Sequence, residues 1–172
     1  MRLTNPVYRA HHPRWGFQPA SGEGAAISGG RFNPIGMAAL YTSVRIETAW
    51  LEAQQSFAFK AQPMTLCAYD VDCNDILDLT LHEIRAEHQI AFEYLACPWK
   101  DLATRGLLPP SWALTQRLHS KKIAGIVVPS FARGAGANDI NVVFWRWSGR
   151  RPHQVKVVDD YNHLPKDTLS WT

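Results

Sequence analysis

The chain has 172 residues, of which 46% are hydrophobic and 19% are charged, and its formal net charge is +3. This composition excludes an intrinsically disordered chain and predicts a single globular domain that spans residues 1–172. The small positive excess is scattered along the sequence, which argues against direct nucleic-acid binding but is compatible with an anionic ligand.

Location and metal content can also be limited from the sequence. No apolar run is long enough to span a membrane, and the N-terminus lacks the apolar core of a signal peptide, so we expect a cytoplasmic protein. The three cysteines, Cys67, Cys73 and Cys97, show no Cys-x-x-Cys spacing, which indicates reduced thiols. No Cys/His grouping has zinc-type spacing, and we therefore expect no metal site.

The first quarter of the chain is predicted to contain two strands joined by a long loop. Residues 7–10 form the first short strand, and residues 11–37 are so rich in Gly, Pro and Ser that we expect mostly loop there. The apolar run at residues 37–43 then predicts a second strand that ends near Thr42 or Ser43.

A helix is predicted directly after this strand, over residues 45–57. Four apolar side chains fall on one broad face of it: Ala49, Trp50, Ala53 and Phe57. Thr48 and Glu52 are four residues apart, which brings them together on a neighbouring face of the same helix.

The rest of the chain mixes strands and helices. Strands are predicted over five apolar runs, at residues 64–71, 75–79, 122–130, 141–147 and 153–160. Helices are predicted over residues 80–96, where Thr80 and Glu83 fit a capping box, and from Ser111, as the N-cap, to residue 121. Strands and helices do not alternate regularly, which favours an α+β domain over a doubly wound sheet.

The loop before the second strand contains the sequence GGRFNPIG. Gly29 and Gly30 allow a sharp turn and a close approach to a ligand, and Asn33 and Pro34 close the loop. Arg31 is therefore held by turn-forming residues, either to bind phosphate oxygens or to cap backbone carbonyl groups. The loop is not a P-loop, because it has no GK[ST] sequence and no helix follows it.

Three further polar side chains are candidates for the same site. Tyr41 lies on the strand after the loop, Glu52 on the following helix, and Ser130 at the end of a buried strand, where sheets commonly present polar groups. Each has a structural alternative: a core aromatic for Tyr41, solvated helix surface for Glu52 and a turn or cap for Ser130. The residue types alone leave both interpretations open.

Several short motifs occur in an order that is typical of one protein family. They are YR at residues 8–9, GGRFNPIG at 29–36, ALYTS at 39–43, ETAWLE at 47–52, VVPS at 127–130 and GAGAND at 134–139. Together they resemble the RES-domain family, the toxins of Xre–RES toxin–antitoxin pairs, and in particular its ParT-like branch. The resemblance covers about residues 7–147. The chain departs from the family at VRIETA, where many relatives have Ser-Pro, and at NDINVVFW, where NLVLF is usual.

The resemblance implies a fold like that of ADP-ribosyltransferases of the diphtheria-toxin type, with a mixed or antiparallel split β-sheet and flanking helices. It also implies that NAD is consumed as a substrate, without a metal. The ParT-like branch implies transfer of ADP-ribose to phosphoribosyl pyrophosphate synthetase, which would block nucleotide synthesis and growth. An Xre-type antitoxin is the implied partner.

Two alternatives to protein modification stay open. The first is an NAD glycohydrolase or phosphorylase that depletes the cellular NAD pool and needs the same residues. The second is a non-enzymatic module that binds a nucleotide or a partner protein. A hydride-transfer enzyme is disfavoured, because no GxGxxG sequence follows a predicted strand.

The family takes its name from an arginine, a glutamate and a serine, which fall here on Arg31, Glu52 and Ser130. The resemblance implies that Glu52 stabilises an oxocarbenium-like ribose, as carboxylates do in glycoside hydrolysis. Arg31 would then hold phosphate and Tyr41 would stack on nicotinamide. Ser130 would bond ribose or phosphate and orient Glu52.

Three more residues complete the predicted NAD-binding set: Tyr8, Arg9 and Asn138. Arg9 would add a second cationic contact to the ligand. Its structural alternative is an ion pair with a carboxylate beside the first strand.

Overall fold

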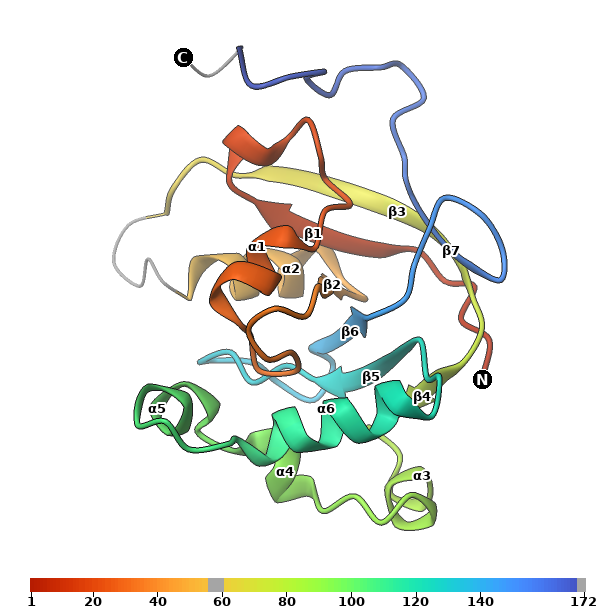
Figure 1. Ribbon diagram of the computed structural model, residues 1–172. Coiled ribbons are helices and arrows are strands. Elements are labelled where there is room, and N and C mark those ends of the chain that lie inside the picture. Colours follow the sequence, from red (N-terminus) through yellow and green to blue (C-terminus); the bar gives the residue numbers. More distant parts are fainter. Residues whose placement is uncertain (56–60, 170–172) are drawn as a thin grey trace.

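Seven strands form one curled, mixed sheet in this computed structural model, which describes residues 1–55 and 61–169 (Figure 1). In chain order the strands are β1 (Val7–His11), β2 (Leu40–Ser43), β3 (Thr65–Cys73), β4 (Ile76–Asp78), β5 (Gly125–Pro129), β6 (Ile140–Phe144) and β7 (His153–Val157). Their spatial order is β4-β5-β6-β2-β1-β3-β7. Every pair of these strands is antiparallel except β4 and β5. The predicted α+β fold, a mixed sheet with flanking helices, is confirmed.

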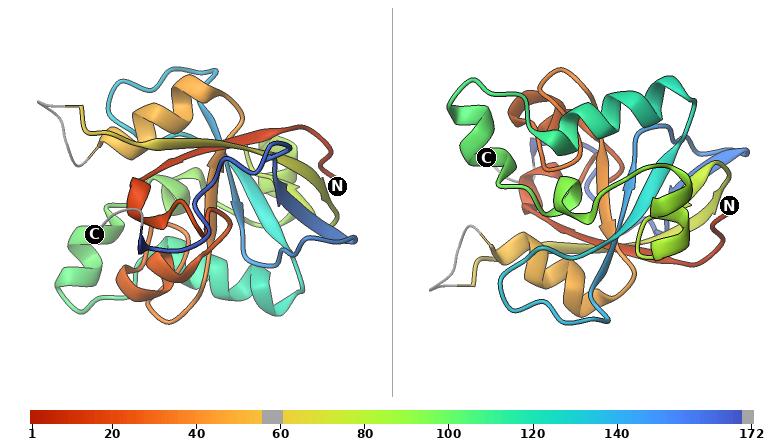
Figure 2. Two further views of the ribbon diagram at one scale, coloured as in Figure 1. Left: turned by 90° about the horizontal axis from the view of Figure 1, so that it is seen from above. Right: turned by 90° about the horizontal axis from the view of Figure 1, so that it is seen from below.

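Helices cover the sheet from two sides. They are α1 (Glu23–Ser28), α2 (Ile46–Gln54), α3 (His82–Glu87), α4 (Phe92–Ala96), α5 (Trp99–Thr104) and α6 (Pro110–Ser120), with a 3-10 turn at Pro13–Trp15. Figure 2 shows α2 and α6 on opposite sides of the molecule, with the strands between them. In the described part of the chain, no helix combines the length and apolar character that a membrane span requires.

The core consists of two hydrophobic clusters that the strands separate. One is centred on β1, β3 and β7 and includes Val7, Leu40, Tyr69, Val71 and Val155. The other packs under α4 and α6 and includes Phe32, Leu95, Leu114, Leu118 and Val143. The neighbouring strands β5 and β6 carry β-branched runs; β5 is buried almost throughout and β6 is buried from Val142 to Phe144, as expected for strands covered on both faces.

Two helical regions differ from the prediction. Residues 11–37 are mostly loop, as predicted, but they also contain the 3-10 turn and α1, which were not predicted. The single helix predicted over residues 80–96 is broken into α3 and α4, and Gln89 between them has a left-handed backbone with φ of 52°. The capping box is also wrong: the Thr80 hydroxyl bonds Asp78 Oδ1 at 2.5 Å, and Leu81 is the N-cap of α3.

The helix expected over residues 45–57 is α2, and its predicted end, with Phe57, lies outside the described residues. Ala49 on its apolar face is buried as expected, but Trp50 is 41% exposed and does not belong to that face. Ser111 does not cap α6 either, since Pro109 is the N-cap and Ser111 is fully buried inside the first turn. Proline tolerates a helix start, because its missing N–H would be unpaired there anyway.

Candidate functional site

A cavity of about 390 Å³ opens between α1, α2 and α5 above the middle of the sheet. Its volume lies within the range of small-molecule sites in proteins. Polar and aromatic side chains line it, among them Tyr8, Arg31, Tyr41, Glu52, Phe131 and Asn141. Arg31 and Glu52 therefore share one cavity, as the predicted site requires.

Polar side chains from three adjacent strands line this cavity at the point where β2 ends and β6 begins. Because β6 is antiparallel to both β2 and β5, its first residues lie beside the last residues of those strands. Ser43 pairs directly with Asn141, and Tyr8 of β1 pairs with Ser43. Ser130 follows β5 at the same edge. Strand register thus brings together Ser43 and Asn141, which lie 98 residues apart in sequence.

Glu52 is fixed at this edge by hydrogen bonds from uncharged groups. Its Oε1 accepts from the Ser130 hydroxyl at 2.6 Å and from Asn141 Nδ2 at 2.5 Å. Its Oε2 accepts from Gln55 Nε2, one turn further along the chain. Asn141 is itself held, because its Oδ1 accepts from the Ser43 hydroxyl at 2.7 Å. The carboxylate therefore has a defined orientation without a contacting cation among the described residues.

The loop after β5 is anchored to α2 on the same side. Thr48 is fully buried and donates its hydroxyl to Asp139 Oδ1 at 2.5 Å, while Asp139 Oδ2 accepts from the Gly136 amide. The Thr48 hydrogen bond, followed by that of Gly136, lowers the pKa of the Asp139 carboxyl group. The Asp139 carbonyl accepts from the Ser130 amide at 2.7 Å, so this clamp also fixes the residue that bonds Glu52.

The glycine-rich loop forms a tight turn that several long-range bonds hold. Gly30 and Asn33 exchange backbone hydrogen bonds, and Trp112 Nε1 donates to the Gly30 carbonyl at 2.7 Å. The Phe32 carbonyl accepts from Thr115 and from Trp145. A Cβ on Gly30 would lie 2.5 Å from the Tyr41 hydroxyl oxygen, so only glycine fits there without displacement.

Arg31 projects from this turn, where it caps backbone carbonyls, one of the two roles expected from the sequence, and also lines the cavity. Its Nη1 donates to the carbonyls of Cys97, at 2.7 Å, and Leu95, at 3.2 Å, beyond and within α4. Its guanidinium also lies 4.6 Å from the centre of the Phe131 ring, a cation–π distance. Burial lowers the pKa of Arg31, and the group still stays charged because arginine titrates far above neutral pH.

Tyr41 contributes its ring to the cavity and its hydroxyl to the loop. The hydroxyl donates to Asn33 Oδ1 at 2.7 Å and accepts from the Phe32 amide at 2.9 Å. Burial raises the pKa of Tyr41 well above its ordinary value, so the phenol is neutral at physiological pH. The two hydrogen bonds of the hydroxyl fix the orientation of the ring beside Arg31.

Of the remaining predicted residues, two line the cavity and two do not. Tyr8 lines the cavity, and so does Arg9, but Arg9 Nη1 is bonded to the carbonyls of Pro19 and Ser21 rather than to a carboxylate. Ser130 is not part of the cavity wall and reaches the site through Glu52. Asn138 is exposed in the loop before β6 and does not line the cavity, because strand register brings Asn141 to that edge instead.

The sequence did not identify several residues of the site, among them Ser43, Gln55, Trp99, Phe131 and Asn141. Ser43 and Asn141 are strand-end polar residues like Ser130, so the same signal could have identified them. Trp99 belongs to α5, a helix that was not predicted. Among the described residues no group of three or more His, Cys, Asp or Glu side chains could hold a metal ion.

The chain is similar to a known protein family and to a solved structure. The family model of the RES domain matches residues 6–167. The fold is similar to that in the crystal structure of the M. tuberculosis MbcT–MbcA toxin–antitoxin complex, with a TM-score of 0.63 and 20% sequence identity. That match covers 92% of this chain and 84% of the other. No curated protein sequence matches this chain.

Proposed function

This chain belongs to the RES-domain family, and on that premise we propose that it is a toxin that breaks the nicotinamide–ribose bond of NAD. One observation carries the proposal: Glu52 is fixed by uncharged donors on the wall of a cavity that it shares with Arg31 and aromatic rings. The fold that the chain shares with a toxin–antitoxin complex supports the assignment as a toxin.

In this proposal Glu52 acts on the charge that develops during bond cleavage. The bonding electron pair leaves with the nicotinamide nitrogen, and positive charge builds on the ribose, as it does in glycoside hydrolysis. A preorganised carboxylate stabilises that charge without first having to reorient. Glu52 also accepts a hydrogen bond from a ribose hydroxyl and polarises the incoming nucleophile, which contributes about 10²- to 10⁴-fold.

Arg31 binds the pyrophosphate of the bent dinucleotide. Only its Nη1 bonds protein carbonyls within the described residues, which leaves Nε and Nη2 as donors for phosphate oxygens. The neighbouring rings of Tyr41 and Phe131 supply flat apolar surfaces on which a nicotinamide ring can stack. Tyr8 adds a further ring to the same cavity.

We further propose that the ADP-ribose is transferred to a protein, and that phosphoribosyl pyrophosphate synthetase is the target. The ParT-like motifs of the sequence support this assignment. A cognate Xre-type antitoxin keeps the toxin inactive in the cytoplasm until growth is to be blocked.

Mass spectrometry of the reaction products tests the proposal. The purified protein is incubated with NAD, with and without the synthetase, and nicotinamide and intact protein masses are measured. Nicotinamide release together with an ADP-ribose adduct on the synthetase is the expected result. Free ADP-ribose, or ADP-ribose 1″-phosphate when phosphate is added, would instead assign an NAD glycohydrolase or phosphorylase. An absence of nicotinamide release would leave only a binding module.

A further inference from the structure

Behind Glu52 lies a short hydrogen-bonded chain that crosses two strands. The Ser43 hydroxyl at the end of β2 bonds Asn141 Oδ1, and Asn141 Nδ2 at the start of β6 bonds Glu52 Oε1. Ser43 is almost fully buried, and Asn141 is half-buried. The backbone of Asn141 is fixed on both sides, because β6 pairs with β2 and with β5.

The chemistry of these groups gives the chain one direction. An ionised carboxylate can only accept hydrogen bonds, so the amide of Asn141 must turn its nitrogen toward Glu52. Its carbonyl oxygen then faces Ser43, which donates its single hydroxyl proton to that oxygen. Both hydrogen bonds require the same orientation of the amide. In a flipped amide, Oδ1 would face the carboxylate, and two acceptors would then be in contact.

We propose that Asn141, held by Ser43, is a positioning residue that fixes the Glu52 carboxylate for cleavage of NAD. The inference rests on the proposed function of the site. Ser130 and Asn141 both bond Oε1, and their directions together define the rotation of the carboxylate. Loss of the amide leaves Ser130 on Oε1 and Gln55 on Oε2, so the carboxylate is less constrained and loses part of its preorganisation.

A double-mutant cycle on nicotinamide release tests the role. Asn141→Ala is expected to lower kcat by about 10- to 100-fold with the KM for NAD changed by less than about 3-fold, since only the transition state loses an interaction. Asn141→Asp, which keeps the size and the Ser43 contact but presents an acceptor to Glu52, is expected to lower kcat further. Ser43→Ala lowers kcat by about 3- to 10-fold. The double variant Ser43→Ala/Asn141→Ala matches Asn141→Ala within about 2-fold, because Ser43 acts through Asn141.

A control variant separates positioning from folding. Val142 is the next residue on β6, is fully buried and does not line the cavity. Val142→Ala is expected to lower the unfolding temperature at least as much as Asn141→Ala while leaving kcat unchanged. Unfolding temperatures of all variants are measured alongside the rates.

The outcomes distinguish this inference from the function on which it rests. If the wild type releases nicotinamide and Asn141→Ala has the same kcat, the positioning role is overturned and the proposed function stands. The role is also overturned if the effects of Ser43→Ala and Asn141→Ala multiply in the double variant. If the folded wild type releases no nicotinamide, the proposed function and this inference both fail.

Discussion

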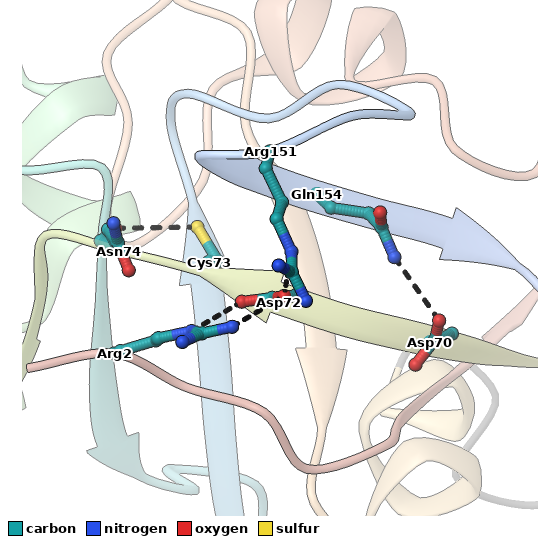
Figure 3. Close-up of polar contacts among 7 residues, drawn as sticks. All are labelled: Arg2, Asp70, Asp72, Cys73, Asn74, Arg151 and Gln154. Carbon is teal, nitrogen blue, oxygen red and sulfur yellow. Dashed lines mark hydrogen bonds and ion pairs between the residues drawn. The ribbon is translucent and has the colours of Figure 1, made fainter.

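Two acidic side chains in this molecule, Glu52 and Asp72, are each held by donors from distant parts of the chain, but these donors differ in charge. Asp72 on β3 bonds Arg2 at 2.6 Å and also pairs with Arg151 (Figure 3). The hydrogen bond from Arg2, followed by the charge of Arg151, lowers the pKa of the Asp72 carboxyl group. Glu52 on α2 is bonded instead by hydroxyl and amide groups, which carry no charge.

This difference separates a carboxylate that stabilises the fold from the one that we propose to act in catalysis. At Asp72 the negative charge is compensated within the protein, and the pairs tie the N-terminal segment and the loop before β7 to β3 (Figure 3). At Glu52 the donors fix the geometry without neutralising the charge. The negative charge of Glu52 acts to raise the pKa of Arg31, but the two side chains form no ion pair in the described part of the chain. The field of Glu52 is therefore left for a positive centre in a ligand.

Removal of the Arg31 guanidinium from the cavity is expected to have the largest effect. Arg31→Ala lowers the rate of nicotinamide release by about 10²-fold or more, as loss of a charge-stabilising donor does in other active sites. It also leaves the carbonyls of Leu95 and Cys97 with one donor fewer, which costs roughly 1–3 kcal/mol of unfolding free energy. Initial rates and denaturant titrations measure the two effects.

Arg151→Ala is the matched control, because it removes a guanidinium from the Asp72 side. Its rate is expected to equal that of the wild type. A wild-type rate for Arg31→Ala would show that Arg31 takes no part in the reaction.

A smaller effect is expected from the loop that carries Arg31. The added Cβ of Gly30→Ala lies 2.5 Å from the Tyr41 hydroxyl oxygen and 2.7 Å from Asn33 Oδ1. The turn must shift to accept it, which costs roughly 1–3 kcal/mol and lowers the rate by about 10-fold through misplacement of Arg31. Gly149→Ala, where the Cβ meets nothing within 4 Å, should change neither quantity. Equal rates for both variants would argue that the loop adjusts freely.

The smallest effect is expected at Asp72, and it depends on pH. Its Arg2 and Arg151 partners are largely exposed, so Asp72→Asn lowers the unfolding temperature by only about 1–3 °C near neutral pH. Because folding lowers the pKa of Asp72, the stabilisation is present above the unfolded value of about 4 and is lost as the pH falls through the lower folded value. Thermal scans from pH 7 to pH 2 should therefore show the wild type and the variant converging at acid pH. A difference that persists at pH 2 would rule out the ion pairs as its source.

Much of the sheet could be predicted from the sequence, because strands such as β5 and β6 are local apolar runs between turn residues. The short helix α1 could not, since its N-cap, Gly22, makes no side-chain hydrogen bond and one of its carbonyls is held by a side chain of the following loop. Asn33 Nδ2 donates to the Ala25 carbonyl at 2.8 Å, a bond that exists only once the loop has folded back. The break between α3 and α4 is likewise set by the left-handed Gln89, which periodicity does not reveal.

The candidate site likewise contains residues that the sequence could identify and residues that it could not. The sequence identified Arg31, Tyr41 and Glu52, which lie within 22 positions on loop, strand and helix, and the structure brings all three to one cavity. Asn141 was missed in favour of Asn138, because the choice between two nearby asparagines depends on the register between β2 and β6. Register is a property of strand pairing, and a single strand does not disclose it.

The most direct test of the account exchanges each carboxylate for its amide and measures both rate and stability. For Glu52→Gln we predict nicotinamide release from NAD that is slower by about 10²-fold or more, with an unfolding temperature within about 2 °C of the wild type. For Asp72→Asn we predict the wild-type rate and a lower unfolding temperature. Nicotinamide release by Glu52→Gln at the wild-type rate would contradict the account.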